Sequence, residues 1–162
     1  MKPRRIAELG VLTGVALILF VVELRLPELT PVPGVKLGFA NIVTVFCVFR
    51  YKPHETALVV LCRIVLGAVF AGNPAALLYS AAGAALCLTG MLLVKPVLNE
   101  KQIWLASVLG AVLHNLGQIT AALLLMRTTV ILGYLPVLLF SGCIAGFVTG
   151  MTAQLLLYRK IL

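Results

Sequence analysis

Four polar side chains lie inside long apolar runs, where each needs a chemical or structural role. Arg63 is about nine residues into one run, and His114, Asn115 and Gln118 lie in another, a stretch of 25 residues without a charge. The 114–118 and 115–118 spacings, i,i+4 and i,i+3, put the last three side chains on one broad helix face. An ionisable group near the centre of a membrane span costs about 2.5–3.5 kcal/mol on insertion scales, so Arg63 needs a partner or a ligand.

The expected depth of these side chains favours a common polar site. At about 1.5 Å per residue, Arg63 lies near 13 Å, and His114 roughly 16 Å, from the inner end of its helix. A small ligand held at this level is one interpretation. For Arg63 the alternative is a structural pair with Glu23 or with helix carbonyls. For Asn115 and Gln118 it is interhelical hydrogen bonding, worth about 0.6 kcal/mol per contact; for His114 this structural interpretation is favoured.

Two further groups lie nearer the helix ends. The segment 33–38 leads into an apolar run with Asn41 one turn further on, and a helix N-terminus beside Lys36 can receive an anionic group. A simple turn with an interfacial lysine explains the same residues. Gly10 and Gly14 form a GxxxG pair next to Ala7, which lets another helix approach closely, either from a different subunit or from the same chain.

Composition decides what kind of protein must position these groups. The 162 residues are 62% hydrophobic and 11% charged, and the mean hydropathy is +1.13. A soluble domain carries about 45–50% apolar and about 25% charged residues. The chain is therefore predicted to be an integral membrane protein that forms a single domain over residues 1–162.

Several functions are excluded by residue type. All five acids are Glu and none is Asp, so aspartate-rich Mg²⁺–diphosphate sites and Asp-dependent triads are absent. No GxxxxGK[ST] loop occurs, so any ATP would be hydrolysed by a partner. The four cysteines form no CxxC and are expected to be small buried side chains. The basic residues are scattered between apolar runs, which does not favour nucleic acid. We expect no enzyme activity, no metal and no cofactor.

The apolar runs predict an all-α protein with six transmembrane helices. The second run has only 13 residues, roughly 20 Å as a helix, which is short for a full span. The last uncharged stretch, 128–158, is expected to begin with a loop. The expected helices are Ala7–Val22, Leu37–Phe49, Thr56–Ala71, Ala75–Val94, Gln102–Met126 and one from about Pro136 to Tyr158.

The charges between these runs predict the orientation. With both termini in the cytoplasm, nine basic residues lie inside and three, Arg25, Lys36 and Arg127, lie outside. This difference follows the positive-inside rule for a multi-pass protein of the cytoplasmic (inner) membrane. The inner residues are Lys2, Arg4, Arg5, Arg50, Lys52, Lys95, Lys101, Arg159 and Lys160.

Two motifs carry a resemblance to a known family. The run PGVKLGFANI (33–42), the run HNLGQ (114–118) and a six-helix layout with Arg63 in the third span resemble the Gx transporter family. That family is also labelled heptaprenyl diphosphate synthase component I. It is similar to the S-components of energy-coupling factor (ECF) transporters, six-helix proteins that capture a vitamin or similar molecule from outside. S-components associate with a shared membrane subunit and two ATPases.

The resemblance implies a role for each local feature. Ala7, Gly10 and Gly14 would contact the coupling subunit, although glycine stands here where alanine is usual, and Pro31–Lys36 would cover the ligand. The expected ligand is a small molecule, flavin-like, quinone-related or isoprenoid, brought in by ATP-driven partners. Two alternatives stay open: a non-catalytic membrane subunit of polyprenyl diphosphate or quinone biosynthesis, and a membrane anchor of a redox complex. The expected substrate-binding residues are Lys36, Asn41, Arg63, His114, Asn115 and Gln118.

Overall fold

The computed structural model describes residues 3–25, 38–72, 74–127 and 129–159, and the regular structure in these ranges is helical. The predicted all-α class is therefore confirmed. Two short 3-10 helices, η1 (Glu100–Gln102) and η2 (Val130–Tyr134), precede the last two long helices. The α-helices are α1 (Pro3–Arg25), α2 (Ala40–Arg50), α3 (Pro53–Ala71), α4 (Pro74–Val94), α5 (Ile103–Met126) and α6 (Leu135–Tyr158).

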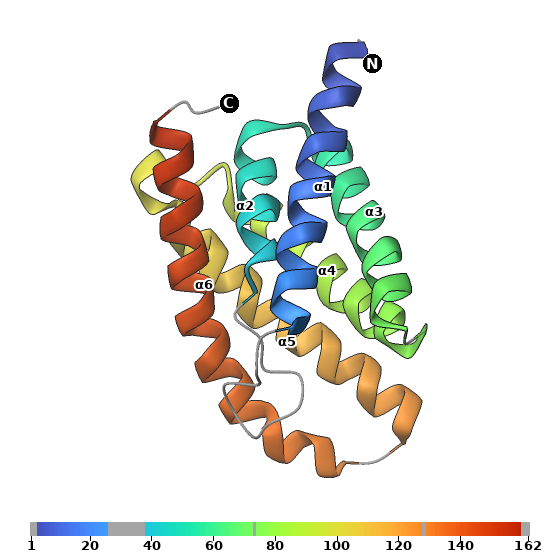
Figure 1. The fold of residues 1–162 in the computed structure, drawn as a ribbon. Coiled ribbons are helices and arrows are strands. Elements are labelled where there is room, and N and C mark those ends of the chain that lie inside the picture. The colour runs from blue at the N-terminus through green and yellow to red at the C-terminus, as the bar shows by residue number, and fades with distance from the viewer. Residues whose placement is uncertain (1–2, 26–37, 73, 128, 160–162) are drawn as a thin grey trace.

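The six α-helices run alternately up and down in one bundle (Figure 1). The start of α1 and the end of α6 lie at the same end of the bundle, which we call the terminal end, together with the α2–α3 turn and the α4–α5 connection. Within the described ranges, five of the helices are long and apolar enough to cross a membrane, and α2 is the shorter sixth. The architecture is that of a multi-pass membrane protein.

Basic residues within the described ranges gather at the terminal end of the bundle. Among the described residues, only Arg25 and Arg127 flank helix ends at the opposite end, and Arg63 lies midway along α3. This asymmetry has the form that the positive-inside rule describes. The terminal-end residues are Arg4, Arg5, Arg50, Lys52, Lys95, Lys101 and Arg159.

The helix ends differ from the predicted ones by a few residues, because charged and capping residues extend the helices beyond the apolar runs. The first helix includes the charged residues at both of its ends and spans 23 residues instead of the expected 16. The third begins at Pro53, a residue type suited to the first helical position. There the Glu55 carboxylate accepts the Lys52 backbone N–H at 3.0 Å, which caps the helix.

An ion pair fastens the first helix to the third at the terminal end. The Arg5 guanidinium donates two hydrogen bonds, each 3.1 Å long, to the two carboxylate oxygens of Glu55. It also lies 4.1 Å from the centroid of the Tyr51 ring, in the range of a cation–π contact. Tyr51 follows α2, so these contacts hold α1, α2 and α3 together.

The short α2 is the most deeply enclosed helix of the bundle. Seven of its 11 residues are buried. One side packs on Leu9 and Leu12 of α1, and another on Met91 of α4 and Ala153 of α6. The Lys95 ammonium donates to the Val48 carbonyl at 2.6 Å and so satisfies an acceptor in the last turn of α2. Protein surrounds this helix, which explains why a run of only 13 apolar residues suffices.

The outer faces of the long helices remain apolar. Val69 of α3 is 72% exposed, Leu124 of α5 75% and Phe140 of α6 71%. Exposed apolar surface on this scale is rare on soluble monomers and fits contact with lipid tails.

Candidate functional site

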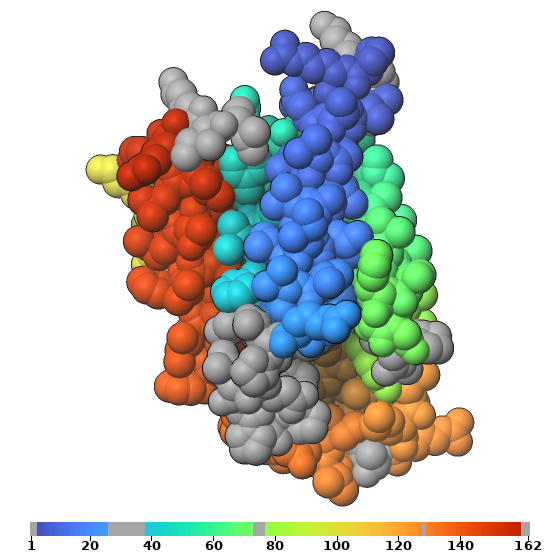
Figure 2. All heavy atoms as spheres, viewed as in Figure 1, coloured from blue at the N-terminus to red at the C-terminus, as the bar shows by residue number. Residues whose placement is uncertain are grey.

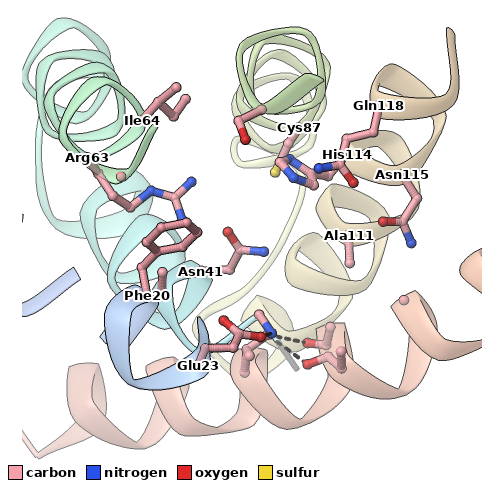
Figure 3. A pocket seen from close by; sticks show the side chains of 18 of the residues that line it. Phe20, Glu23, Asn41, Arg63, Ile64, Cys87, Ala111, His114, Asn115 and Gln118 are labelled. Carbon is pink, nitrogen blue, oxygen red and sulfur yellow. Dashed lines mark hydrogen bonds between the residues drawn. The ribbon is translucent and has the colours of Figure 1, made fainter. Parts of the chain in front are cut away.

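The interior of the bundle contains a cavity of about 240 Å³ to which all six α-helices contribute. Figure 3 shows its side chains: Arg63 reaches in from α3, while His114 and Gln118 reach in from α5 on the other side. Asn41 of α2 lies between them in this view. The walls combine these polar groups with apolar side chains such as Phe20 and Met91.

Five of the six residues predicted from the sequence to bind substrate line this one cavity. They come from three helices, α2, α3 and α5, and two of them, Arg63 and His114, lie near the middle of their helices. The sixth, Lys36, and the predicted cover Pro31–Lys36 lie outside the described residues. The five are Asn41, Arg63, His114, Asn115 and Gln118. Their part in binding a substrate stays a prediction.

Arg63 has the least satisfied polar group described here. Its Nε atom is buried and has no hydrogen-bond partner among the described residues. The guanidinium points into the cavity beside the Phe20 ring (Figure 3). Glu23, the predicted structural partner, lines the same cavity.

The Glu23 carboxylate joins the end of α1 to the start of the α2 region. It is 8% exposed and accepts a hydrogen bond from the backbone N–H of Gly38. A carboxylate that receives a backbone N–H next to a helix start is favourable, because that end of the helix carries partial positive charge. Glu23 therefore fixes the wall of the cavity at the end opposite the terminal end.

Asn115 and His114 also contact neighbouring helices. The Asn115 amide donates to the Leu138 carbonyl of α6 at 2.6 Å, the interhelical bond that the structural interpretation expected. The His114 imidazole packs closely on Gly83 of α4, where an added Cβ would lie 2.9 Å from His114 Cε1. Both residues still line the cavity, so their structural contacts and a role in the cavity are compatible.

Two glycines make room for these polar side chains. A Cβ at Gly83 would lie 2.9 Å from both His114 Cε1 and Gln118 Cγ, and 2.8 Å from the His114 carbonyl oxygen. A Cβ at Gly142 would overlap the Asn115 amide nitrogen. The absence of a side chain at these two positions sets the close spacing of α4, α5 and α6 and the direction of the α5 side chains.

Several lining residues were not predicted from the sequence, although the spacing of four of them contains a signal. Ser107, Ala111, His114 and Gln118 all line the cavity and follow each other at spacings of four, three and four. This is one face of a helix. Extending the face of His114 toward the helix start would have found Ser107, whose hydroxyl lies 3.1 Å from that of Thr149 in α6.

The small residues of α1 lie on a different surface. Ala7 and Gly10 are exposed, and Gly14 is partly exposed. A Cβ at Gly10 or Gly14 would meet no described atom within 4 Å. Figure 2 shows α1 uncovered along the face toward the viewer. The described helices therefore do not pack on this pair, and its role as a partner contact stays a prediction.

The lining of the cavity mixes polar groups with apolar walls. In the described ranges no group of three or more His, Cys, Asp or Glu side chains is placed to hold a metal ion. The lining instead offers one guanidinium, one carboxylate and several amide and hydroxyl groups between apolar walls. Such a mixture, mostly apolar with a few polar groups, is typical of small-molecule sites.

The fold and the cavity together define a class: a helical multi-pass membrane protein with a polar chamber among its helices. A family model for heptaprenyl diphosphate synthase component I matches residues 12–156, so the chain belongs to that family. This agrees with the resemblance carried by the two motifs. No curated protein and no solved structure matches the chain.

Proposed function

We propose that this protein is a substrate-binding membrane subunit, of the S-component type, of an ECF-like transporter. In this proposal it captures a small molecule from outside the cell, and partner subunits drive uptake with ATP. The observation that carries the proposal is the cavity of about 240 Å³ that collects five predicted binding residues from three helices. A protein that only anchored a complex would need no such chamber.

Two other features support the proposal. The pair Gly10 and Gly14, open on the outside of α1, provides a surface on which a helix of a coupling subunit could pack. The basic residues at the terminal end support a cytoplasmic location for that end under the positive-inside rule. Glu23 and Asn41 would then lie toward the outside, where the substrate arrives.

A second candidate follows from the family's description. A component of a prenyl diphosphate synthase could be a non-catalytic membrane subunit that recruits a soluble enzyme. The chain has no Asp, so it lacks the paired aspartates that would hold Mg²⁺ and a diphosphate. In this alternative the chain binds an enzyme and is not one itself.

Affinity purification of the tagged protein from its own membrane tests both candidates. Recovery of a membrane subunit with ATPases, together with a bound small molecule, is expected for the transporter. Recovery of a soluble prenyl synthase would support the second candidate. A flavoprotein partner without ATPases would instead indicate an anchor of a redox complex.

A further inference from the structure

The buried guanidinium of Arg63 indicates the chemical class of the ligand. The Arg63 side chain lines the cavity, and its buried Nε–H has no acceptor among the described residues. A buried guanidinium with an unused donor is unfavourable, because the lost hydration has not been replaced. We infer that the ligand is a small organic oxyanion, a carboxylate or a phosphate, whose oxygens accept from Arg63. This inference rests on the proposed function.

Apart from the Glu23 carboxylate, which already accepts the Gly38 N–H, the other polar groups of the cavity also favour an acceptor-rich ligand. Asn41 and Gln118 each offer an amide NH₂, and Ser80 and Tyr79 each offer a hydroxyl. An ionised carboxylate or phosphate has only acceptors, and charge-assisted bonds from arginine to such groups are short and strong. The guanidinium would bind the charge while the amides and hydroxyls reach the remaining oxygens.

Volume and wall composition limit the rest of the ligand. The cavity of about 240 Å³ is smaller than the range of about 300–1,000 Å³ common for drug-sized ligands. Phe20, Ile64 and Met91 supply apolar surface on three helices. A compact body, such as a single ring with one acidic group, fits this space, and a long polyprenyl chain does not.

The experiment uses the full chain purified in mild detergent, as wild type, Arg63→Gln and Arg127→Gln. Arg127 is the matched control, because it is exposed at the end of α5 and does not line the cavity. Mass spectrometry first identifies compounds that remain bound. After these are washed out, thermal unfolding is followed with benzoate, phenyl phosphate, benzamide or benzylamine as the added probe.

We expect an acidic compound on the wild type and on Arg127→Gln, and its loss from Arg63→Gln. Benzoate or phenyl phosphate should raise the melting temperature of the two proteins that keep Arg63, the wild type and Arg127→Gln. Benzamide and benzylamine should not. Removing one charge-assisted hydrogen bond should weaken anion binding by about 10- to 100-fold. A response to benzoate alone identifies a carboxylate, and a response to phenyl phosphate alone identifies a phosphate.

Three outcomes would overturn the inference and leave the proposed function intact. These are a bound compound without an acidic group, benzamide or benzylamine acting as strongly as the anions, and an anion effect that persists in Arg63→Gln. Should Arg63→Gln not fold, Arg63→Met, which also removes the charge, replaces it, and unchanged anion affinity in that variant would contradict the inference. If the wild type neither retains a compound nor responds to a probe, both the inference and the proposed function fail.

Discussion

Buried polar side chains in this bundle differ in how many of their hydrogen-bonding groups find a partner within the protein. Asn115 has the Leu138 carbonyl, Ser107 and Thr149 have each other, and Glu23 has the Gly38 N–H. Arg63 has no described acceptor at Nε. Groups with protein partners contribute to stability, whereas a group without one is a candidate for binding.

Replacing Asn115 with alanine should have a modest structural cost. The variant loses the 2.6 Å hydrogen bond to Leu138, and comparable interhelical bonds in membranes are worth about 0.6–1.7 kcal/mol. We expect a small drop in the thermal unfolding midpoint of the purified, ligand-free protein. Thr120→Ala is the control, because the Thr120 hydroxyl bonds only within its own helix, to Leu116, and it should leave the midpoint unchanged.

The polar half of the cavity could be predicted from the sequence and the apolar half could not. Arg63 or Gln118 is conspicuous in an apolar run, so its residue type alone marks it. Phe20 and Met91 have the same residue types as lipid-facing neighbours, and only the arrangement of helices distinguishes them. Glu23 was predicted as a possible partner of Arg63, but its bond to Gly38 depends on how the second helix starts.

At the scale of the helices, α2 shows that the length of an apolar run does not predict where its helix lies in the bundle. The second apolar run in the sequence is short for a full span, and the structure shows that α2 is enclosed by its neighbours. A helix shielded by protein need not match the thickness of the hydrocarbon core, because its ends can be satisfied by side chains such as Lys95. The number of helices could be predicted, but this central position could not.

Close packing of α4 on α5 predicts a strong effect of one methyl group. Gly83→Ala would bring a Cβ within 2.8 Å of a backbone oxygen, so the helices must separate. Overpacking of this kind typically costs about 1–3 kcal/mol. We expect a lower unfolding midpoint and weaker binding of any cavity ligand, because His114 and Gln118 shift together.

Gly10→Ala supplies the matched control for that experiment. A Cβ there meets nothing within 4 Å, and alanine favours helix over glycine by about 1 kcal/mol. The midpoint of this variant should be unchanged or slightly higher. An equal loss of stability in both variants would contradict the assignment of Gly83 to a helix contact.

At the scale of the whole molecule, substitutions on the outer face of α1 can test assembly with partner subunits separately from folding. Gly10→Leu and Gly14→Leu place a large side chain where the described protein has open space. We expect both variants to fold and to retain ligand binding, while recovery of partner subunits in affinity purification falls at least about tenfold. Val11→Ala, on an exposed residue next to the pair, is the control. Unchanged partner recovery would show that the pair faces only lipid.

Orientation in the membrane is a second property of the whole molecule. The positive-inside rule predicts that the terminal end is cytoplasmic. A cysteine introduced at Lys101 should react with a membrane-impermeant maleimide only after the cells are opened, and one introduced at Thr129 should react in intact cells. Wild type controls for the four native cysteines, of which Cys47 and Cys87 are buried. The reverse labelling pattern would invert the predicted topology.

Because every helix contributes to the wall of the chamber, a guest molecule would touch all parts of the bundle at once. Ligand that binds only the folded state adds a free energy of RT ln(1 + [L]/Kd). A guest present at 100 times its Kd would add about 2.7 kcal/mol. The protein with a bound guest should therefore unfold as a whole at a higher temperature and detergent concentration than the protein without one. Solubilised membranes can then be screened for the natural guest by measuring how much protein stays folded.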